Sequence, residues 1–182
     1  MLIRMDFPKV KRVIALPFIL LHIGYLYFNV AQAEGRDSYI GIQTGSANTS
    51  FDVLSSDVDL NFLMIQLGAW MDDNTSLELR MGKGLGDDSI GPLDVDIESI
   101  GGMYLAYHWN LGSHASIYGI AGGSAASFKF SVSGDSNQDD YYSLSYGAGM
   151  KFSILSVEYM RYLDTTDVEA DAISVGLHYA FD

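Results

Sequence analysis

The stretch "AISVGLHYAF", residues 172–181, decides the fold of this chain. Bulky apolar residues alternate in it with small or polar ones. One face carries Ile173, Val175, Leu177, Tyr179 and Phe181, and the other carries Ser174, Gly176, His178 and Ala180. A period of two residues predicts a β-strand whose two faces meet different surroundings.

Similar runs recur along the chain and are separated by turn-forming residues. The eight runs are 39–45, 60–71, 76–86, 99–110, 116–130, 142–154, 156–163 and 172–181. The spacers alternate between short ones (72–75, 111–115 and Leu155) and longer acidic ones (46–59, 87–98, 131–141 and 164–171). Short turns at one end and long loops at the other are typical of an up-and-down barrel. We therefore expect an all-β fold, an eight-stranded antiparallel up-and-down transmembrane β-barrel.

The distribution of polar residues favours a membrane barrel over its architectural alternative, a soluble β-sandwich. In "LELRMGKGLG" (77–86), Leu77, Leu79 and Met81 alternate with Glu78, Arg80 and Gly82. Charges and glycines on one face suit a narrow lumen, and the apolar face would then meet lipid. Aromatic residues near strand ends are predicted to form two interfacial girdles. These are Trp109, Tyr118, Phe152, Tyr179 and Phe181 at the periplasmic end, and Phe128, Phe130, Tyr141, Tyr142 and Tyr162 at the outer end. Strict alternation points Trp70 and Tyr162 inward, which predicts bulges in their strands.

The first 33 residues differ in character from the rest. Arg4, Lys9, Lys11 and Arg12 precede the uncharged apolar run 13–30, and "AQA" follows with Ala31 and Ala33. This order predicts a secretory signal peptide, residues 1–33, cleaved after Ala33. Residues 34–182 would form the barrel domain. An uncleaved membrane helix is the alternative, although Pro17, His22 and Gly24 interrupt the run.

Composition excludes several classes of function. The chain has no cysteine, which rules out disulfides, thiol catalysis and thiolate metal sites. Its 10 Lys and Arg stand against 23 Asp and Glu, so a nucleic acid is not an expected partner. No cofactor is predicted.

The final strand resembles the sorting signal of bacterial outer-membrane barrels, in which a polar residue, a glycine, a hydrophobic residue and an aromatic residue stand at fixed spacing. Ser174, Gly176, Tyr179 and Phe181 occupy those positions, and Asp182 departs from the pattern by following the terminal aromatic. The chain as a whole is similar to the small OmpA/OmpX/opacity-type outer-membrane β-barrel family. The resemblance implies insertion by the barrel assembly machinery and a location in the outer membrane of a Gram-negative cell.

Five charged or titratable residues fall on predicted lumen-facing positions near the periplasmic end: Glu78, Arg80, Lys151, Glu158 and His178. We expect them to meet in one ion-pair cluster, because charges removed from water need partners. A gated or proton-coupled pore is the functional alternative. An eight-stranded barrel is only wide enough for side chains to fill it, which favours the structural interpretation.

Two other patterns point to possible chemistry. His114 and Ser116 form a His-x-Ser pair, similar to that of barrel-type lipid A deacylases, but they lie in a predicted periplasmic turn with no Glu nearby. The long spacers contain many carboxylates and no Lys or Arg. Such carboxylates suit Ca²⁺ or Mg²⁺, through which they could bridge to lipopolysaccharide phosphates. A solvated acidic surface is the simpler interpretation, and an omptin-like surface protease is opposed by the strand count.

The sequence therefore predicts a non-enzymatic outer-membrane protein with a structural or surface-interaction role. A narrow porin-like channel for ions or small solutes is the first alternative, and a lipid-modifying enzyme is the second.

Overall fold

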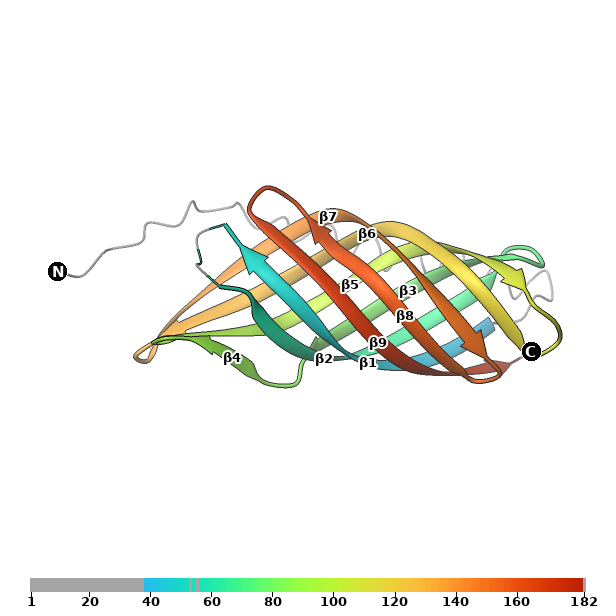
Figure 1. Ribbon diagram of the computed structural model, residues 1–182, viewed down its shortest axis with the longest axis horizontal. Helices are drawn as coiled ribbons and strands as arrows, with labels where there is room; N and C mark the ends of the chain where they lie inside the picture. Colours follow the sequence, from blue (N-terminus) through green and yellow to red (C-terminus); the bar gives the residue numbers. More distant parts are fainter. Residues whose placement is uncertain (1–37, 53, 55, 182) are drawn as a thin grey trace.

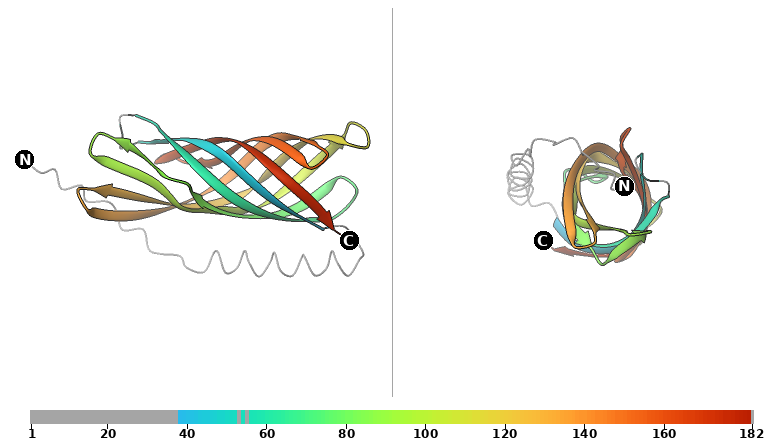
Figure 2. Two further views of the ribbon diagram at one scale, coloured as in Figure 1. Left: turned by 90° about the horizontal axis from the view of Figure 1, so that it is seen from below. Right: turned by 90° about the vertical axis from the view of Figure 1, so that its left-hand side faces the viewer.

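The computed structural model describes residues 38–52, 54 and 56–181, which form one antiparallel β-sheet closed into a ring (Figures 1 and 2). The strands are β1 (Ser38–Phe51), β2 (Val58–Trp70), β3 (Thr75–Gly84), β4 (Asp87–Ile90), β5 (Leu93–Asn110), β6 (Ala115–Val132), β7 (Asp135–Phe152), β8 (Leu155–Asp164) and β9 (Val168–Phe181). The predicted signal segment, with Ala31 and Ala33, lies outside the described residues. In the described part of the chain, no helix has the length and apolarity needed to cross a bilayer.

Nine strands occupy eight positions around the ring. The second half of β5 pairs with β3, and its first four residues pair with β4, so β3 and β4 share one position. The ring closes where β1 pairs with β9, from Ser38 opposite Phe181 to Phe51 opposite Val168. The predicted eight-stranded antiparallel barrel is confirmed, with its third strand interrupted at Leu85 and Gly86.

The predicted long loops are largely strand. β6 and β7 continue through the acidic spacer and leave only Ser133 and Gly134 as a two-residue turn, both with positive φ (51° and 94°). Two positive φ angles are typical of the hairpin turn that matches strand twist. The sequence predicted loops here because Asp and Ser are poor strand formers, and that prediction was wrong. Here the inner face of each hairpin carries buried apolar residues such as Val95 and Phe130, which hold the strands together.

The periplasmic turn between β7 and β8 also differs from the prediction. It falls at Ser153 and Ile154 rather than at Leu155, which already pairs with Phe152. Ser153 has φ 55°, in the left-handed region that a tight turn requires.

The outward faces of the strands form an apolar belt, as expected of a surface in contact with lipid. Its exposed side chains include Ile40, Ile42, Leu63, Ile65, Met81, Leu105, Ile117, Met150, Val157, Val175 and Leu177. At the periplasmic rim Trp109, Phe152 and Tyr179 are exposed and Phe181 is half-buried, which agrees with the girdle expected there.

The outer girdle was predicted from the wrong aromatic residues. Phe128, Phe130 and Tyr162 point inward and are buried. Tyr118, predicted for the periplasmic girdle, is also buried in the interior. Tyr141 packs against the same apolar interior, and Tyr142 is half-buried. The outward aromatics at the outer edge are Tyr146 and Tyr159, whose hydroxyls donate to Asp164 and Asp171. Strand alternation alone could not separate lipid-facing rings from rings that fill the extracellular interior.

The expected bulges occur in only one of the two strands. The pairing of β8 with β9 shifts between Arg161 and Leu163, which places the bulge at Tyr162. Both pairings of β2 are regular. Trp70 sits at the periplasmic end with its ring centroid 4.7 Å from that of His108, so no bulge is needed there.

Candidate functional site in the barrel interior

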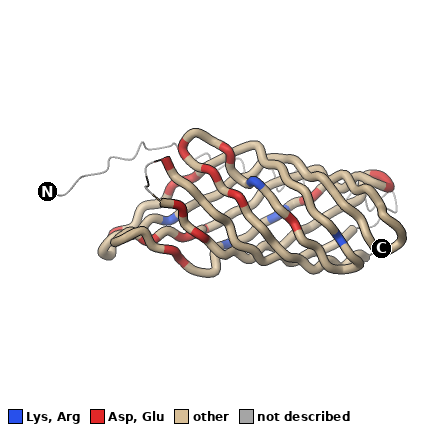
Figure 3. The backbone as a smooth tube through the Cα atoms, in the orientation of Figure 1, with Lys and Arg blue, Asp and Glu red and all other residues tan. Residues whose placement is uncertain are grey.

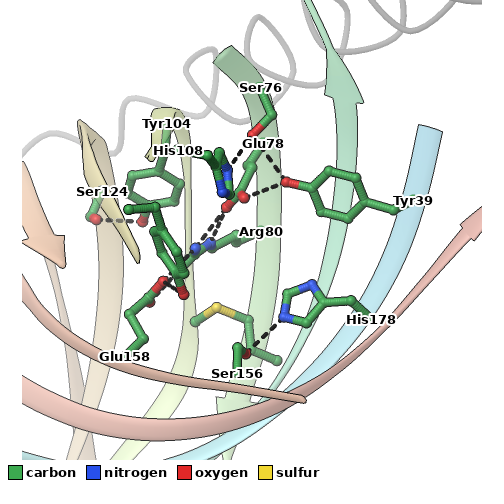
Figure 4. A network of polar contacts seen from close by, with 12 residues as sticks. Tyr39, Ser76, Glu78, Arg80, Tyr104, His108, Ser124, Ser156, Glu158 and His178 are labelled. Atoms are coloured by element: carbon green, nitrogen blue, oxygen red, sulfur yellow. Dashed lines mark hydrogen bonds and ion pairs between the residues drawn. The ribbon is translucent and has the colours of Figure 1, made fainter. Parts of the chain in front are cut away.

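Arg80 is the centre of a buried ionic network in the periplasmic half of the lumen (Figure 4). Its Nε and Nη2 donate to Glu78 Oε2 at 3.0 and 2.6 Å. Its Nη1 and Nη2 donate to Glu158 Oε1 and Oε2 at 2.5 and 2.9 Å. β3 supplies Glu78 and Arg80, and β8 lies across the barrel with Glu158, so one guanidinium links opposite walls. This fork geometry is the one in which Arg binds carboxylates most strongly.

Phenols and a histidine complete the network around the two carboxylates. Tyr39 on β1 donates to Glu78, and Tyr118 on β6 donates to Glu158 at 2.9 Å. Ser76 lies 3.1 Å from the Tyr39 hydroxyl and 3.4 Å from His108 Nε2. The face of Tyr104 covers the guanidinium, with the Arg80 carbon 5.1 Å from the ring centroid.

Lys151 and His178 were expected in the same cluster, but the ion pairs of the described residues include neither. Lys151 Nζ lies 5.4 Å from the centroid of the Tyr39 ring, in a cation–π arrangement. His178 Nε2 lies 2.8 Å from Ser156 Oγ. The structure thus brings Glu78, Arg80 and Glu158 into contact and places the other two residues beside them.

A second polar region lies beside small residues of β1 and β9 and includes one side chain of β2. Gln43, Gln66 and His178 are buried, and each has a side-chain nitrogen or oxygen with no hydrogen-bonding partner. Gly41 lies between Gln66 and His178 across the sheet, and a Cβ there would stand 3.2 and 3.1 Å from their side chains. Among the described residues, no group of three or more His, Asp or Glu side chains could hold a metal ion.

Apolar side chains fill the outer half of the interior. Phe51 of β1 makes edge contacts with Phe128 and Phe130 of β6, each with ring centroids 5.2 Å apart. Phe62 of β2 makes a similar contact with Tyr162 of β8, at 6.0 Å. These rings are 0–7% exposed. The interior therefore consists of two layers, an ionic one toward the periplasm and an aromatic one toward the outside.

The carboxylates predicted for the loops lie mainly on the outer ends of the strands (Figure 3). These residues are Asp52, Asp57, Asp59, Asp87, Asp88, Asp94, Asp96, Glu98, Asp135, Asp139, Asp140, Asp164, Asp167, Glu169 and Asp171. Three of them have shifted pKa values, and hydrogen bonds from Arg161 lower the pKa of Asp171. Backbone N–H groups of Asp59 and Ser89 lower the pKa of Asp88, whereas burial and the neighbouring Asp140 raise the pKa of Asp139.

Arg161 sits among several of these carboxylates on the outer rim. Arg161 Nε and Nη2 donate to Asp171 at 2.8 and 2.7 Å. Asp164 and Glu169 lie 3.8 and 4.0 Å from its guanidinium. We call these four residues the rim cluster, which keeps an excess of negative charge.

The remaining sequence candidates stay apart from both layers. Ser174 and Gly176 are on the inward face of β9, while Tyr179 is exposed toward lipid. His114 lies in the exposed turn before β6, where its Nδ1 is 2.7 Å from Ser113 Oγ rather than paired with Ser116. Ser116 points into the barrel and is buried.

A closed antiparallel ring with an apolar belt outside and a packed interior defines a transmembrane β-barrel. The family described as "Outer membrane protein beta-barrel domain" matches residues 18–181, and the chain belongs to it. Its location is the outer membrane of a Gram-negative bacterium. No curated protein sequence matches the chain.

Solved structures give the same fold at low sequence identity. Ail, the attachment invasion locus protein of Yersinia pestis, is 20% identical, with a TM-score of 0.60 over 80% of this chain and 99% of Ail. A second Ail structure, in complex with the heparin analogue sucrose octasulfate, is 19% identical, with a TM-score of 0.59 and the same coverage. Neisserial surface protein A is 15% identical, with a TM-score of 0.65 over 79% of this chain and 97% of that protein.

Sequence reasoning missed the uncharged members of the ionic network. Tyr39, Tyr118, Ser76 and His108 all reach the carboxylates or their partners, but the sequence pattern assigned none of them to the ionic cluster. Tyr118 was assigned to a girdle because of its place near a strand end. Its position on the same face as Ser116 and Ile120 was the available signal that it points inward.

Proposed function

We propose that this chain is a non-enzymatic, non-conducting anchor in the outer membrane whose extracellular extension takes part in surface interactions. The filling of the interior by two successive layers carries this proposal. An ion crossing the lumen would have to displace Arg80 from two carboxylates and then pass the rings of Phe51, Phe128 and Tyr162. Desolvating an ion beside such rings is costly, which argues against the channel alternative.

The surface-interaction role is supported by what lies outside the membrane. The outer ends of the strands and their hairpins carry most of the carboxylates of the chain (Figure 3). Two proteins of the same fold are named for attachment and for the cell surface, and one of them has been solved with a heparin analogue. An acidic exterior would repel a sulfated polysaccharide, so the partner of this chain would differ in charge.

Lipopolysaccharide is proposed as a lipid partner through divalent cations. The rim cluster stands at the outer boundary of the apolar belt, next to Tyr146 and Tyr159. Its excess carboxylates would repel lipid phosphates directly but could share Ca²⁺ or Mg²⁺ with them. An enzymatic role at this boundary lacks support, because His114 and Ser116 lie at the opposite end of the barrel without a carboxylate.

The proposal includes export and assembly. Residues 1–33 would direct secretion and be removed after Ala33, and Ser174, Gly176, Tyr179 and Phe181 would be read by the barrel assembly machinery. Mass spectrometry of the protein isolated from membranes tests the cleavage, and a Phe181→Ala variant with reduced outer-membrane levels would support the role of the last strand.

Conductance decides between the anchor and the channel. The chain is refolded in detergent, its folding is verified by faster gel migration without boiling, and it is inserted into a planar lipid bilayer. We expect no stepwise current above that of a protein-free bilayer, and reproducible single-channel steps would overturn the proposal. A mass shift of lipid A upon overexpression would instead support a lipid-modifying enzyme.

A further inference from the structure

The outer half of β7 has a strand partner on one side only. β7 pairs with β6 along its whole length, from Phe152 opposite Ala115 to Asp135 opposite Val132. Its pairing with β8 begins at Phe152 and stops where Tyr146 faces Arg161. Among the described residues, no strand pairs with the other edge of residues 135–145. In Figure 1 the β6–β7 hairpin and the β8–β9 hairpin end in different places at the outer end.

The bulge at Tyr162 explains why the pairing stops. An extra residue in one strand bends it and increases its twist, so β8 turns away from β7 at this point. Side chains then replace the backbone ladder: Ser145 Oγ donates to the Tyr162 carbonyl at 2.8 Å, and Ser143 Oγ accepts the Asp164 N–H at 3.1 Å. The end of the ladder is thus capped, and the edge beyond it stays open.

The register identifies the backbone groups that face this open edge. Phe152 and Leu155 flank the two-residue turn between β7 and β8, so Phe152 directs its N–H and C=O toward β8. Directions alternate along a strand, and the pairing of β6 with β7 contains no bulge. Ser136, Gln138, Asp140 and Tyr142 therefore present their N–H and C=O groups away from β6. Residues 135–138 are exposed and residues 139–143 are half-buried.

Carboxylates stand on both sides of this edge. Asp135, Asp139 and Asp140 belong to β7, and Asp164 and Asp167 belong to the end of β8 and the turn that follows it. Burial, then Asp139 and Asp167, raise the pKa of Tyr141 to about 12, which agrees with carboxylates from both hairpins lying close to one phenol. Lys129 on β6, opposite Gln138, is the nearest base in the pairing.

An unpaired strand edge is a template for an added strand, and its charge selects the partner. Two copies of this chain joined edge to edge would bring their own carboxylates together, which opposes self-pairing. Lys or Arg residues of an incoming strand would instead face acids on both sides.

We propose that the open edge of β7, residues 135–142, binds an extended basic segment of a partner protein as an added β-strand. This inference rests on the proposed surface-interaction role and specifies its site and the chemistry of its partner.

The test uses the full barrel in detergent and a fluorescent peptide of about ten residues in which Lys alternates with Thr or Val, with a Lys→Glu peptide as its counterpart. Fluorescence anisotropy should show saturable binding of the basic peptide only, weakened by added salt. Gln138→Pro removes an outward N–H without breaking the β6 ladder and should weaken binding by roughly tenfold or more. Gln138→Ala is its matched control, since it loses the same bond from Gln138 to Ser127 but keeps the N–H.

Charge variants test the choice of partner separately. Asp139→Asn with Asp140→Asn should weaken binding, whereas Asp57→Asn with Asp87→Asn, an equal change of charge elsewhere on the outer end, should not. All variants must keep heat-modifiable gel mobility. The inference is overturned by absence of peptide binding, by equal binding of the acidic peptide, by Gln138→Pro binding like the wild type, or by self-association that Gln138→Pro abolishes. Conductance of the same preparation reports on the anchor proposal alone, so the two failures are distinguishable.

Discussion

Replacing Arg80 with methionine should destabilise the barrel more than any other single change in the lumen. The substitution keeps an unbranched apolar stem but removes the guanidinium, and with it four hydrogen bonds to Glu78 and Glu158. Both carboxylates would stay buried with only phenol partners. Removing one partner of a buried ion pair costs about 3–5 kcal/mol, and Arg80 serves two carboxylates, so we expect a loss near 5 kcal/mol.

Urea unfolding in lipid vesicles, followed by tryptophan fluorescence, measures this loss as a shift of the midpoint at unchanged slope. Two variants separate the effect of charge from that of packing. Arg80→Lys keeps the charge without the two-sided fork and should fall between the wild type and Arg80→Met. The triple variant Arg80→Met, Glu78→Gln, Glu158→Gln should recover most of the loss, because no unpaired charge remains.

A loss below about 1 kcal/mol for Arg80→Met would refute this reasoning, since such a value is typical of a solvated surface pair. It would mean that water reaches both carboxylates, and the packed interior on which the anchor proposal depends would have to be abandoned. A triple variant as unstable as Arg80→Met would show that packing of the guanidinium, and not charge, is what matters.

Three further predictions concern the interior and the extracellular hairpins. Gly122→Ala should cost about 1–3 kcal/mol, because a Cβ would stand 2.0 Å from the Met103 carbonyl oxygen, whereas Gly123→Ala, with its nearest atom at 3.9 Å, should cost less than about 0.5 kcal/mol in the same urea assay. Phe128→Ala should cost about 3–5 kcal/mol, because its ring contacts Phe51 in the outer layer. Gel mobility should show that this variant unfolds at a lower urea concentration, although its lipid-facing belt is unchanged. Asp139→Asn should raise the melting temperature at pH 7 and have less effect near pH 4. The pKa of Asp139 is raised in the folded state, so its contribution to stability is present below the unfolded pKa and is lost as pH rises through the folded pKa. At pH 7 the neutral Asn therefore removes an unfavourable charge.

The barrel and its charged lumen are predictable from the sequence because both depend on a period of two. Once Leu79 is assigned to lipid, Glu78 and Arg80 must face the lumen, and the same reasoning places Glu158. The contact of Arg80 with Glu158 across the barrel is harder to predict from the sequence, because it depends on the relative heights of β3 and β8 along the barrel axis. Lys151 illustrates this, because it has the correct face and lies against Tyr39 without a carboxylate partner.

The outer half of the molecule was harder to predict, for a different physical reason. Within the bilayer, inward residues are polar and outward residues are apolar, whereas beyond it the solvent is water and the inner face becomes apolar. Phe128 and Phe130 follow the alternation of β6 without a break, yet the rule that assigns aromatic residues to lipid no longer applies to them. The point along each strand at which the inner face changes from polar to apolar is set by the edge of the membrane. The alternation of residues in the sequence does not indicate where that edge lies.

The ionic network also has a consequence for how the barrel is assembled. Its members come from β1, β3, β5, β6 and β8, so it forms only when five separate strands are in register. A slip of one residue in the hairpin that contains β3 would turn both Glu78 and Arg80 toward lipid and leave Glu158 buried without the guanidinium. An Arg that faces lipid costs about 2–4 kcal/mol at the bilayer midplane. Misregistered barrels are therefore penalised before they close, and the network acts as a checkpoint for the correct arrangement of strands.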